Sequence, residues 1–235
     1  MKLLVLAGGF GTRLKSAVSD VPKALAPVNG VPFLRFQIEN WIRQGLTSFV
    51  FLLHHEAQLI IDFLEKEKNG LLENCEVDWI VEPSPMGTGG AIANAVACMS
   101  ISGSFMVTNA DTWLGSGIEA VAQTGSPAMA VVRVEDARRY GGVQFDDRNV
   151  VSRFVEKSAL AQPGWINAGL YHLDATLFKH WDAEPFSVET TSLFAWGSQG
   201  NLKATPIEAD FIDIGIPDDY FRFCRWMESQ RASTL

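Results

Sequence analysis

Residues 6–14 read LAGGFGTRL and begin at the last residue of the apolar run Leu3–Leu6. Three glycines, a threonine and an arginine therefore lie where the first predicted strand ends. Glycines let a backbone approach a phosphate and direct its amides inward, and an arginine adds a guanidinium that binds oxyanions in bidentate fashion. The stretch predicts a phosphate-binding loop at the first strand-to-helix turn of an α/β fold.

Two standard nucleotide-binding motifs do not fit this loop. A GxGxxG pattern that begins at Gly9 would need a third glycine where Leu14 stands. No register of the loop gives the GxxxxGK[ST] pattern of a Walker A loop. On the loop alone a second interpretation stays open, in which the glycines serve only a turn with positive φ and Arg13 lies in solvent.

The composition limits the classes of partner. The chain has 235 residues with 19 basic and 27 acidic side chains, a formal charge of −8. An acidic chain is poorly suited to non-specific binding of nucleic acids or membranes, because both surfaces are anionic. Cys75, Cys98 and Cys224 lie far apart without a CxxC pair, which favours free thiols in a reducing cytoplasm over a zinc site. No apolar stretch approaches the length of a membrane span.

The first half of the sequence alternates between apolar strands and amphipathic helices. Pro32 before and Gly45 after the first expected helix are typical start and stop signals. The alternation predicts a Rossmann-like, mostly parallel mixed sheet flanked by helices. Expected strands cover residues 2–6, 48–53, 77–81 and 105–108, and expected helices cover residues 33–44, 57–68 and 90–99.

The second half changes character and predicts an antiparallel addition beside that sheet. We expect one domain over residues 1–235, with a nucleotide half of about 1–125 and a substrate half of about 126–235. The last residues, 229–235, are expected to fray. Expected short strands cover residues 128–134, 142–145, 153–156, 165–173 and 211–214, with a hairpin turn at 146–149 and a final helix at 218–230.

Two aspartates are candidates for a metal site. Asp111 follows the strand expected at 105–108, and a carboxylate at the carboxyl end of a parallel strand points into the crevice where open sheets bind ligands. Asp213 lies between isoleucines, where a lone acid is costly to bury unless it is paired or bound to a metal. Two hard oxygen ligands that leave room for phosphates and water suit Mg²⁺. For either aspartate alone, a cap or turn role stays open.

LAGGFGTRL followed by PKALAPVNGVPFL resembles the signature of the sugar-1-phosphate nucleotidyltransferases, LAGGxGTRL…PKxxxPVxGxPxL. The resemblance implies that Lys23 bridges the α-phosphate and the sugar phosphate. Asp111 resembles the family's first metal aspartate, and FIDIGIPDDY resembles the family's IDxGTPxxY, which supplies the second, Asp213. The resemblance as a whole implies that these two aspartates hold Mg²⁺ and that Arg13, Lys23 and Asp111 are catalytic. The chain departs from the family's motifs at two positions. It has NAD at 109–111 where the family often has NGD, and Ile216 where the family has threonine, and neither change removes a metal ligand. The resemblance implies that Gly8, Gly9, Gly11, Thr12 and Arg13 bind the triphosphate. Leu6 and Ala7 are further implied nucleotide contacts.

The segment EPSPMGTGG, residues 82–90, resembles the part of the family that reads the nucleotide base. A carboxylate offers only acceptors, and guanine presents two adjacent donors, N1–H and the 2-amino group, so Glu82 favours GTP. A glutamine would suit uracil or thymine better. A backbone contact from Gly87 could override this preference, and a solvated loop glutamate is the alternative. The implied base contacts are Glu82, Pro85, Gly87 and Thr88.

Three segments of the second half resemble the family's sugar pocket: YGGVQF at 140–145, FVEK at 154–157 and INAGLY at 166–171. Glu156 and Asn167 suit hydroxyl groups, and Lys157 suits the sugar phosphate. A solvated Glu–Lys pair on a strand edge is the alternative for residues 156 and 157. The implied sugar contacts are Gly142, Glu156, Lys157, Asn167 and Gly169.

The implied reaction is attack of a sugar 1-phosphate oxygen on the α-phosphorus of a nucleoside triphosphate, with loss of pyrophosphate. The nucleophile is already ionised at neutral pH, so the main obstacle is repulsion between anions, which Arg13, Lys23 and Mg²⁺ would screen. Within the family, the same segments look most like the guanylyltransferases that act on D-glycero-α-D-manno-heptose 1-phosphate in bacterial surface-polysaccharide pathways.

Several alternatives are compatible with the sequence. They are a transferase for mannose or another hexose 1-phosphate, a uridylyl or thymidylyl transferase, and an inactive regulatory subunit that binds nucleotide sugars. Retention of Arg13, Lys23 and both aspartates argues against the inactive subunit. The residues leave the oligomeric state open, with a homodimer as one option.

Overall fold

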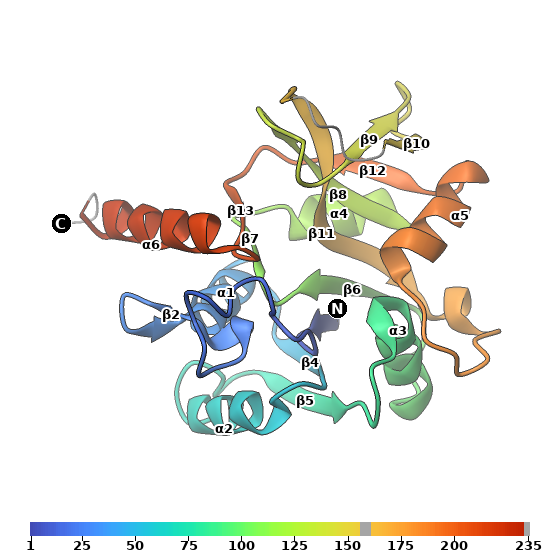
Figure 1. Cartoon of the computed structure of the whole chain (residues 1–235). Helices are drawn as coiled ribbons and strands as arrows, with labels where there is room; N and C mark the ends of the chain where they lie inside the picture. The colour runs from blue at the N-terminus through green and yellow to red at the C-terminus, as the bar shows by residue number, and fades with distance from the viewer. Residues whose placement is uncertain (156–160, 233–235) are drawn as a thin grey trace.

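The structure is a computed structural model that describes residues 1–155 and 161–232 (Figure 1). Within these residues, seven strands form one sheet in the order β12-β8-β11-β6-β1-β4-β5. All run parallel except β11, which is antiparallel to both of its neighbours, β6 and β8. The strands are β1 Leu3–Leu6, β4 Ser48–Leu53, β5 Glu76–Val81, β6 Ser104–Asn109, β8 Ala128–Val134, β11 Gly164–Asp174 and β12 Lys203–Pro206.

Helices cover both faces of this sheet. Leu3 and Val5 of β1 point to a core formed with α1 (Phe33–Arg43), α2 (Ala57–Glu67) and α4 (Ile118–Thr124). Leu4 points to the opposite core, formed with α3 (Gly87–Cys98) and α5 (Leu193–Ser198). A strand buried on both sides needs an unbroken apolar run, and LLVL supplies one.

The last helix, α6 (Pro217–Ala232), extends away from the sheet (Figure 1). Its side chains Tyr220 and Phe223 join a third apolar cluster with Phe33 of α1 and Trp113. Three short antiparallel pairs complete the strands: β2 Pro27–Val28 with β3 Val31–Pro32, β7 Thr112–Leu114 with β13 Phe211–Asp213, and β9 Gly142–Phe145 with β10 Val151–Val155. The remaining short helices are Lys23–Leu25, Ala175–Phe178 and the π-helical turn Val188–Ser192.

The predicted fold class is confirmed, with differences in detail. The hairpin turn at 146–149 is present, because Asp146 Oδ1 accepts from the amides of Arg148 and Val150. Strands β8, β11 and β12 do not lie beside the parallel sheet but continue it, whereas β9 and β10 form a separate antiparallel pair. Helix α3 begins three residues before the expected position 90. Helix α6 includes residues 229–232 of the tail that was expected to fray, and residues 233–235 of that tail lie outside the described residues.

Among the helices of residues 1–155 and 161–232, none combines the length and the apolarity that a membrane crossing requires.

Candidate functional site

The strand order reverses between β1 and β6. The chain runs from β1 outward to β4 and β5, and then places β6 on the other side of β1. The carboxyl ends of β1 and β6 border this switch, and open α/β sheets bind ligands in the crevice at such a point. The glycine loop follows β1 and Asp111 follows β6, so the fold brings both sequence features to one place.

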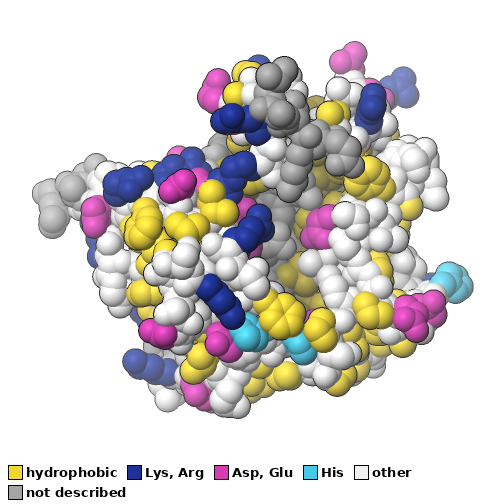
Figure 2. Space-filling model, in the orientation of Figure 1, with side chains coloured by type: hydrophobic (Ala, Val, Ile, Leu, Met, Phe, Trp, Pro, Cys, Tyr) yellow, Lys and Arg dark blue, Asp and Glu magenta, His cyan; other side chains and the backbone are white. Residues whose placement is uncertain are grey.

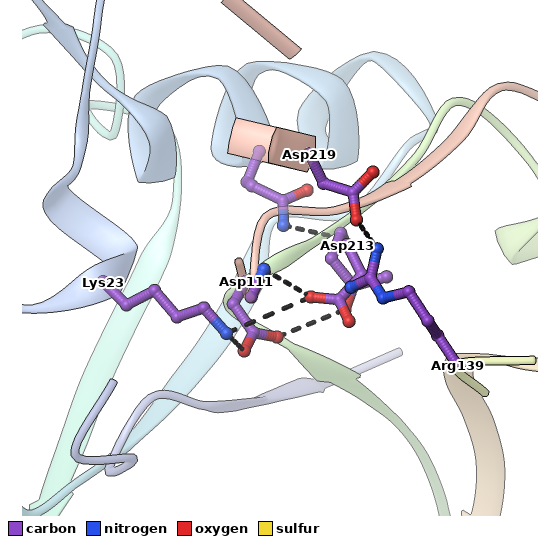
Figure 3. Close-up of polar contacts among 8 residues, drawn as sticks. Lys23, Asp111, Arg139, Asp213 and Asp219 are labelled. Carbon is purple, nitrogen blue, oxygen red and sulfur yellow. Dashed lines mark hydrogen bonds and ion pairs between the residues drawn. The ribbon is translucent and has the colours of Figure 1, made fainter. Parts of the chain in front are cut away.

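A short strand pair brings the two aspartates together. β7 begins directly after Asp111, and its partner β13 ends at Asp213, with Asp213 opposite Thr112. The amide of Ile214 donates to the carbonyl of Asp111 at 3.0 Å. The side chains of Asp111 and Asp213 point toward one another (Figure 3). Burial and the nearby Asp111 carboxylate raise the pKa of Asp213, and Lys23 offsets part of this effect.

Lys23 lies against this carboxylate pair. Pro22 fixes the backbone before a single 3₁₀ turn, and the lysine side chain is only 13% exposed. Its Nζ is 2.5 Å from Asp111 Oδ2 and 4.0 Å from Asp213 Oδ1 (Figure 3). Gly215 closes the group, because its amide donates to Asp213 Oδ1 at 2.7 Å. The predicted convergence of Lys23, Asp111 and Asp213 is therefore present in the geometry.

The carboxylate pair fits Mg²⁺ better than a metal held by protein alone. Among the described residues, no group of three or more His, Cys, Asp or Glu side chains could hold a metal ion. Mg²⁺ is commonly bound through one or two carboxylates, with water and substrate phosphates in its other positions. Asp111 and Asp213 are partly exposed, at 34% and 23% of the side chain, so both have oxygens that a bound ion could reach.

The glycine loop borders a cavity of about 410 Å³. Gly11 has φ +59°, and its carbonyl accepts from the amide of Leu14 at 3.0 Å. The chain does not enter a helix here, contrary to the expected strand-to-helix turn, because residues 12–17 form turns and α1 begins only at Phe33. The predicted residues that line this cavity are Leu6, Ala7, Gly9, Gly11, Thr12, Arg13, Lys23 and Asp111.

A second cavity, of about 370 Å³, lies on the β4 and α3 side of the loop. Glu82 lies in its wall with only 8% of the residue exposed, so the solvated alternative is wrong. Its Oε2 accepts from the amide of Met86 at 3.0 Å, and burial raises the pKa of its carboxyl group. The predicted residues Leu6, Gly8, Gly9, Glu82, Pro85, Gly87, Thr88 and Asp111 line this cavity.

A third cavity, of about 330 Å³, lies between β11 and the β9–β10 pair. Asn167 is fixed at both ends of its amide, since Nδ2 donates to Tyr171 Oη at 2.8 Å and Oδ1 accepts from the amide of Gly169 at 2.9 Å. Gly142, Asn167, Gly169 and Asp213 all line this space. The predicted Glu156 and Lys157 lie outside the described residues.

The three cavities share walls. Asp111 borders the first two, and Asn109 and Glu189 border the second and third. Figure 2 shows this face hollowed near its centre, with Lys and Arg side chains along one side of the hollow. Ligands in neighbouring cavities would therefore meet beside Lys23 and the two carboxylates.

Sequence reasoning missed several residues of this site. Asn109 and Gly215 stand beside predicted residues in the segments NAD and IDIG, so adjacency could have indicated them. Tyr140 is the first residue of the segment YGGVQF and lines the third cavity, but it was not predicted as a site residue. Glu189 had no signal in the sequence, because it comes from a π-helical turn that only the fold brings near Thr88.

Comparisons with known proteins cover almost the whole chain. Residues 2–230 match the nucleotidyl transferase family. D-glycero-alpha-D-manno-heptose 1-phosphate guanylyltransferase of Campylobacter jejuni is 33% identical over 227 residues, covering 95% of this chain and 98% of the relative. Mannose-1-phosphate guanyltransferase of Emericella nidulans is 28% identical over 228 residues, covering 94% of this chain and 62% of that protein. The crystal structure of HddC from Yersinia pseudotuberculosis complexed with GMP-PN has a TM-score of 0.83 at 35% identity, covering 96% of this chain and 99% of that one.

Proposed function

The chain belongs to the nucleotidyl transferase family, and from that premise we propose that it joins GTP to D-glycero-α-D-manno-heptose 1-phosphate, giving GDP-heptose and pyrophosphate. The observation that carries the proposal is the meeting of Lys23, Asp111 and Asp213 where three cavities adjoin. Similarity over nearly full length to a relative named for this reaction supports the choice of substrates.

Lys23 and Arg13 would hold the anionic substrates against their mutual repulsion. Lys23 already offsets the repulsion between two carboxylates, so its ammonium lies where negative charge accumulates. Arg13 lines the glycine-loop cavity and would bind the triphosphate together with the loop amides. A phosphate oxygen of the sugar substrate needs no base at neutral pH, so alignment and charge screening are the main tasks of these residues.

Asp111 and Asp213 would hold Mg²⁺. The ion would supply further screening of phosphate charge when bound. Gly215 would keep the Asp213 carboxylate in place through its amide.

Glu82 would select the guanine base. Its buried carboxylate offers acceptors to the two adjacent donors of guanine, while Met86 N–H fixes the orientation of one oxygen. Gly142, Asn167 and Gly169 would contact the sugar, with Glu156 and Lys157 completing that set. The proposal divides the chain into a nucleotide half, about residues 1–125, and a sugar half, about residues 126–235.

We also propose a cytoplasmic location and a role in supplying precursors of surface polysaccharides. Cys75, Cys98 and Cys224 are free thiols, which fits a reducing compartment.

A pyrophosphate-release assay tests the proposal. GTP, ATP, UTP and dTTP would each be combined with the 1-phosphates of D-glycero-α-D-manno-heptose, mannose and glucose, with Mg²⁺ present. We expect the highest kcat/KM for GTP with the heptose phosphate, loss of turnover in Lys23→Ala, and normal turnover in the surface control Lys66→Ala. A preference for mannose 1-phosphate or for UTP would refute the assigned substrates, and no release from any combination would favour a regulatory subunit.

A further inference from the structure

An ion pair joins the segment between β8 and β9 to the last helix. Arg139 lies in the segment between β8 and β9, and its guanidinium pairs with the carboxylate of Asp219 in the first turn of α6 (Figure 3). The Asp219 side chain is 12% exposed, and its Oδ1 also forms an ion pair with Arg222 Nη2 at 3.1 Å. Buried carboxylates require such partners, so this pair fixes where the 135–141 segment meets α6.

The same arginine supports Tyr140. The Arg139 guanidinium lies 5.3 Å from the centre of the Tyr140 ring, and that ring packs edge-on against Phe211 at 5.6 Å. Tyr140 and Gly141 line the third cavity, whereas Arg139 is not among its lining residues. Arg139 therefore contacts the wall of the cavity through Tyr140, while 38% of its own side chain is exposed.

The pair also lies beside the carboxylate site. Asp213 lines the third cavity together with Tyr140, which the Arg139 guanidinium contacts. The amide of Tyr220 donates to the carbonyl of Ile216 at 3.0 Å, so the start of α6 is tied to the segment that follows Asp213. One side chain thus connects the wall of the proposed sugar cavity with the backbone that carries a proposed metal ligand.

We propose that Arg139 is a positioning residue for the sugar substrate. Through its ion pair with Asp219 it holds Tyr140 in the wall of the third cavity at a fixed place relative to Asp213. The inference rests on the proposed function, because it assigns that cavity to the sugar 1-phosphate. It adds a role for two residues that are not among those lining the three cavities.

Steady-state kinetics of Arg139→Gln, Asp219→Asn and the double variant test the proposal. We expect each single variant to raise KM for the sugar 1-phosphate about tenfold while KM for the nucleotide changes less than about twofold. The double variant should be no worse than either single one, because both remove the same interaction. Arg139→Lys keeps the ion pair and should recover most of the lost affinity. Arg138→Gln, which breaks only the exposed pair with Asp136, is the matched control.

Two results would overturn the proposal. If Arg139→Gln raised KM for the sugar 1-phosphate and Asp219→Asn did not, Arg139 would act on a substrate by its own charge. If the increase in KM in the double variant were the product of the two single increases, the two residues would act independently.

Hydrogen exchange without substrate provides a readout that does not depend on turnover. Peptides spanning 135–145 should exchange faster in both single variants, and unchanged exchange there would also overturn the proposal. A wild-type protein that used no sugar phosphate would refute the proposed function, while the exchange result would still decide whether the ion pair holds this segment.

Discussion

Gly215 leaves no room for a side chain beside the proposed catalytic group. A β-carbon at position 215 would lie 2.7 Å from Asp213 Oδ1 and 3.0 Å from Lys23 Nζ. We expect Gly215→Ala to displace the carboxylate and to lower kcat on the order of 100-fold, as small misplacements of reacting groups do. Gly70→Ala is the control, because its β-carbon would meet nothing closer than 3.9 Å. Turnover within a few-fold of wild type in Gly215→Ala would contradict the assignment of this group.

Glu82 gives a prediction about the choice of base. Replacing it with glutamine exchanges one acceptor for a donor, which then faces a donor of guanine. We expect Glu82→Gln to lower kcat/KM for GTP roughly 100-fold, since a buried mismatched pair costs about 1–3 kcal/mol. The loss for UTP or dTTP should be smaller. Kinetics with each nucleotide would check this, and an equal loss for all of them would show that Glu82 does not read the base.

The individual residues of the site differed in how far the sequence could predict them. Asp111 and Asp213 could be paired in advance because Asp111 follows a strand end, Asp213 would be costly to bury alone, and the family resemblance assigns both to one metal. The ammonium of Lys23 also has a local signal, the preceding proline. Glu189 could not be found in this way, since its contact with Thr88 Oγ1 at 2.5 Å depends on two elements far apart in the chain.

The start of α3 is fixed by a loop from the second half of the chain. The carbonyl of Phe186 accepts from the amides of Gly89 at 2.9 Å and Gly90 at 3.2 Å, which satisfies the first turn of the helix. The glycines allow this approach, because a β-carbon on Gly87 would lie 2.5 Å from the same carbonyl oxygen. Three glycines so close together are poor helix formers, which explains why the sequence predicted the helix only from residue 90.

This contact predicts that alanine substitution costs more stability at Gly87 than at Gly200, although the two glycines have nearly equal φ. Gly87 has φ +69° and Gly200 has φ +70°, but a β-carbon on Gly200 would meet nothing within 4 Å. We expect Gly200→Ala to cost about 1 kcal/mol of unfolding free energy from the positive φ alone. Gly87→Ala should cost roughly 3 kcal/mol, because the Phe186 backbone must also move. Urea denaturation would measure both values, and equal costs would show that the contact with Phe186 is not restrictive.

At the scale of the whole molecule, local patterns indicated the strands but not how they are ordered. Hydrophobic runs predict that residues 165–173 form a strand, yet nothing local places β11 between β6 and β8. That placement depends on pairings between distant segments, such as Tyr171 with Val107 and with Met129. Short elements such as β7 and α4 were not predicted, because they have too few residues to show a hydrophobic periodicity. The resemblance of the motifs indicates the family but does not specify the order of the strands.

The insertion of β11 also buries a histidine in the middle of the sheet. His172 is 5% exposed, and burial lowers its pKa, an effect that backbone groups of Gly125 and Val121 partly offset. The folded protein therefore resists protonation at this ring, whereas the unfolded chain binds the proton near pH 6.5. Stability contributed by the neutral ring is fully present above that pH and is lost as the pH falls through it toward the lower folded-state pKa.

We expect the free energy of unfolding to fall between pH 7.5 and pH 5.5 by up to about 1.4 kcal/mol on account of this residue. Substituting His172→Phe should remove that part of the pH dependence, even if it changes the stability at pH 7.5. His180→Gln replaces an exposed histidine and should leave the slope unchanged. Urea denaturation of the three proteins at both pH values would measure the difference. If His172→Phe keeps the slope of the wild type, the pH dependence arises elsewhere, and the ring of His172 accepts a proton as readily in the folded sheet as in the unfolded chain.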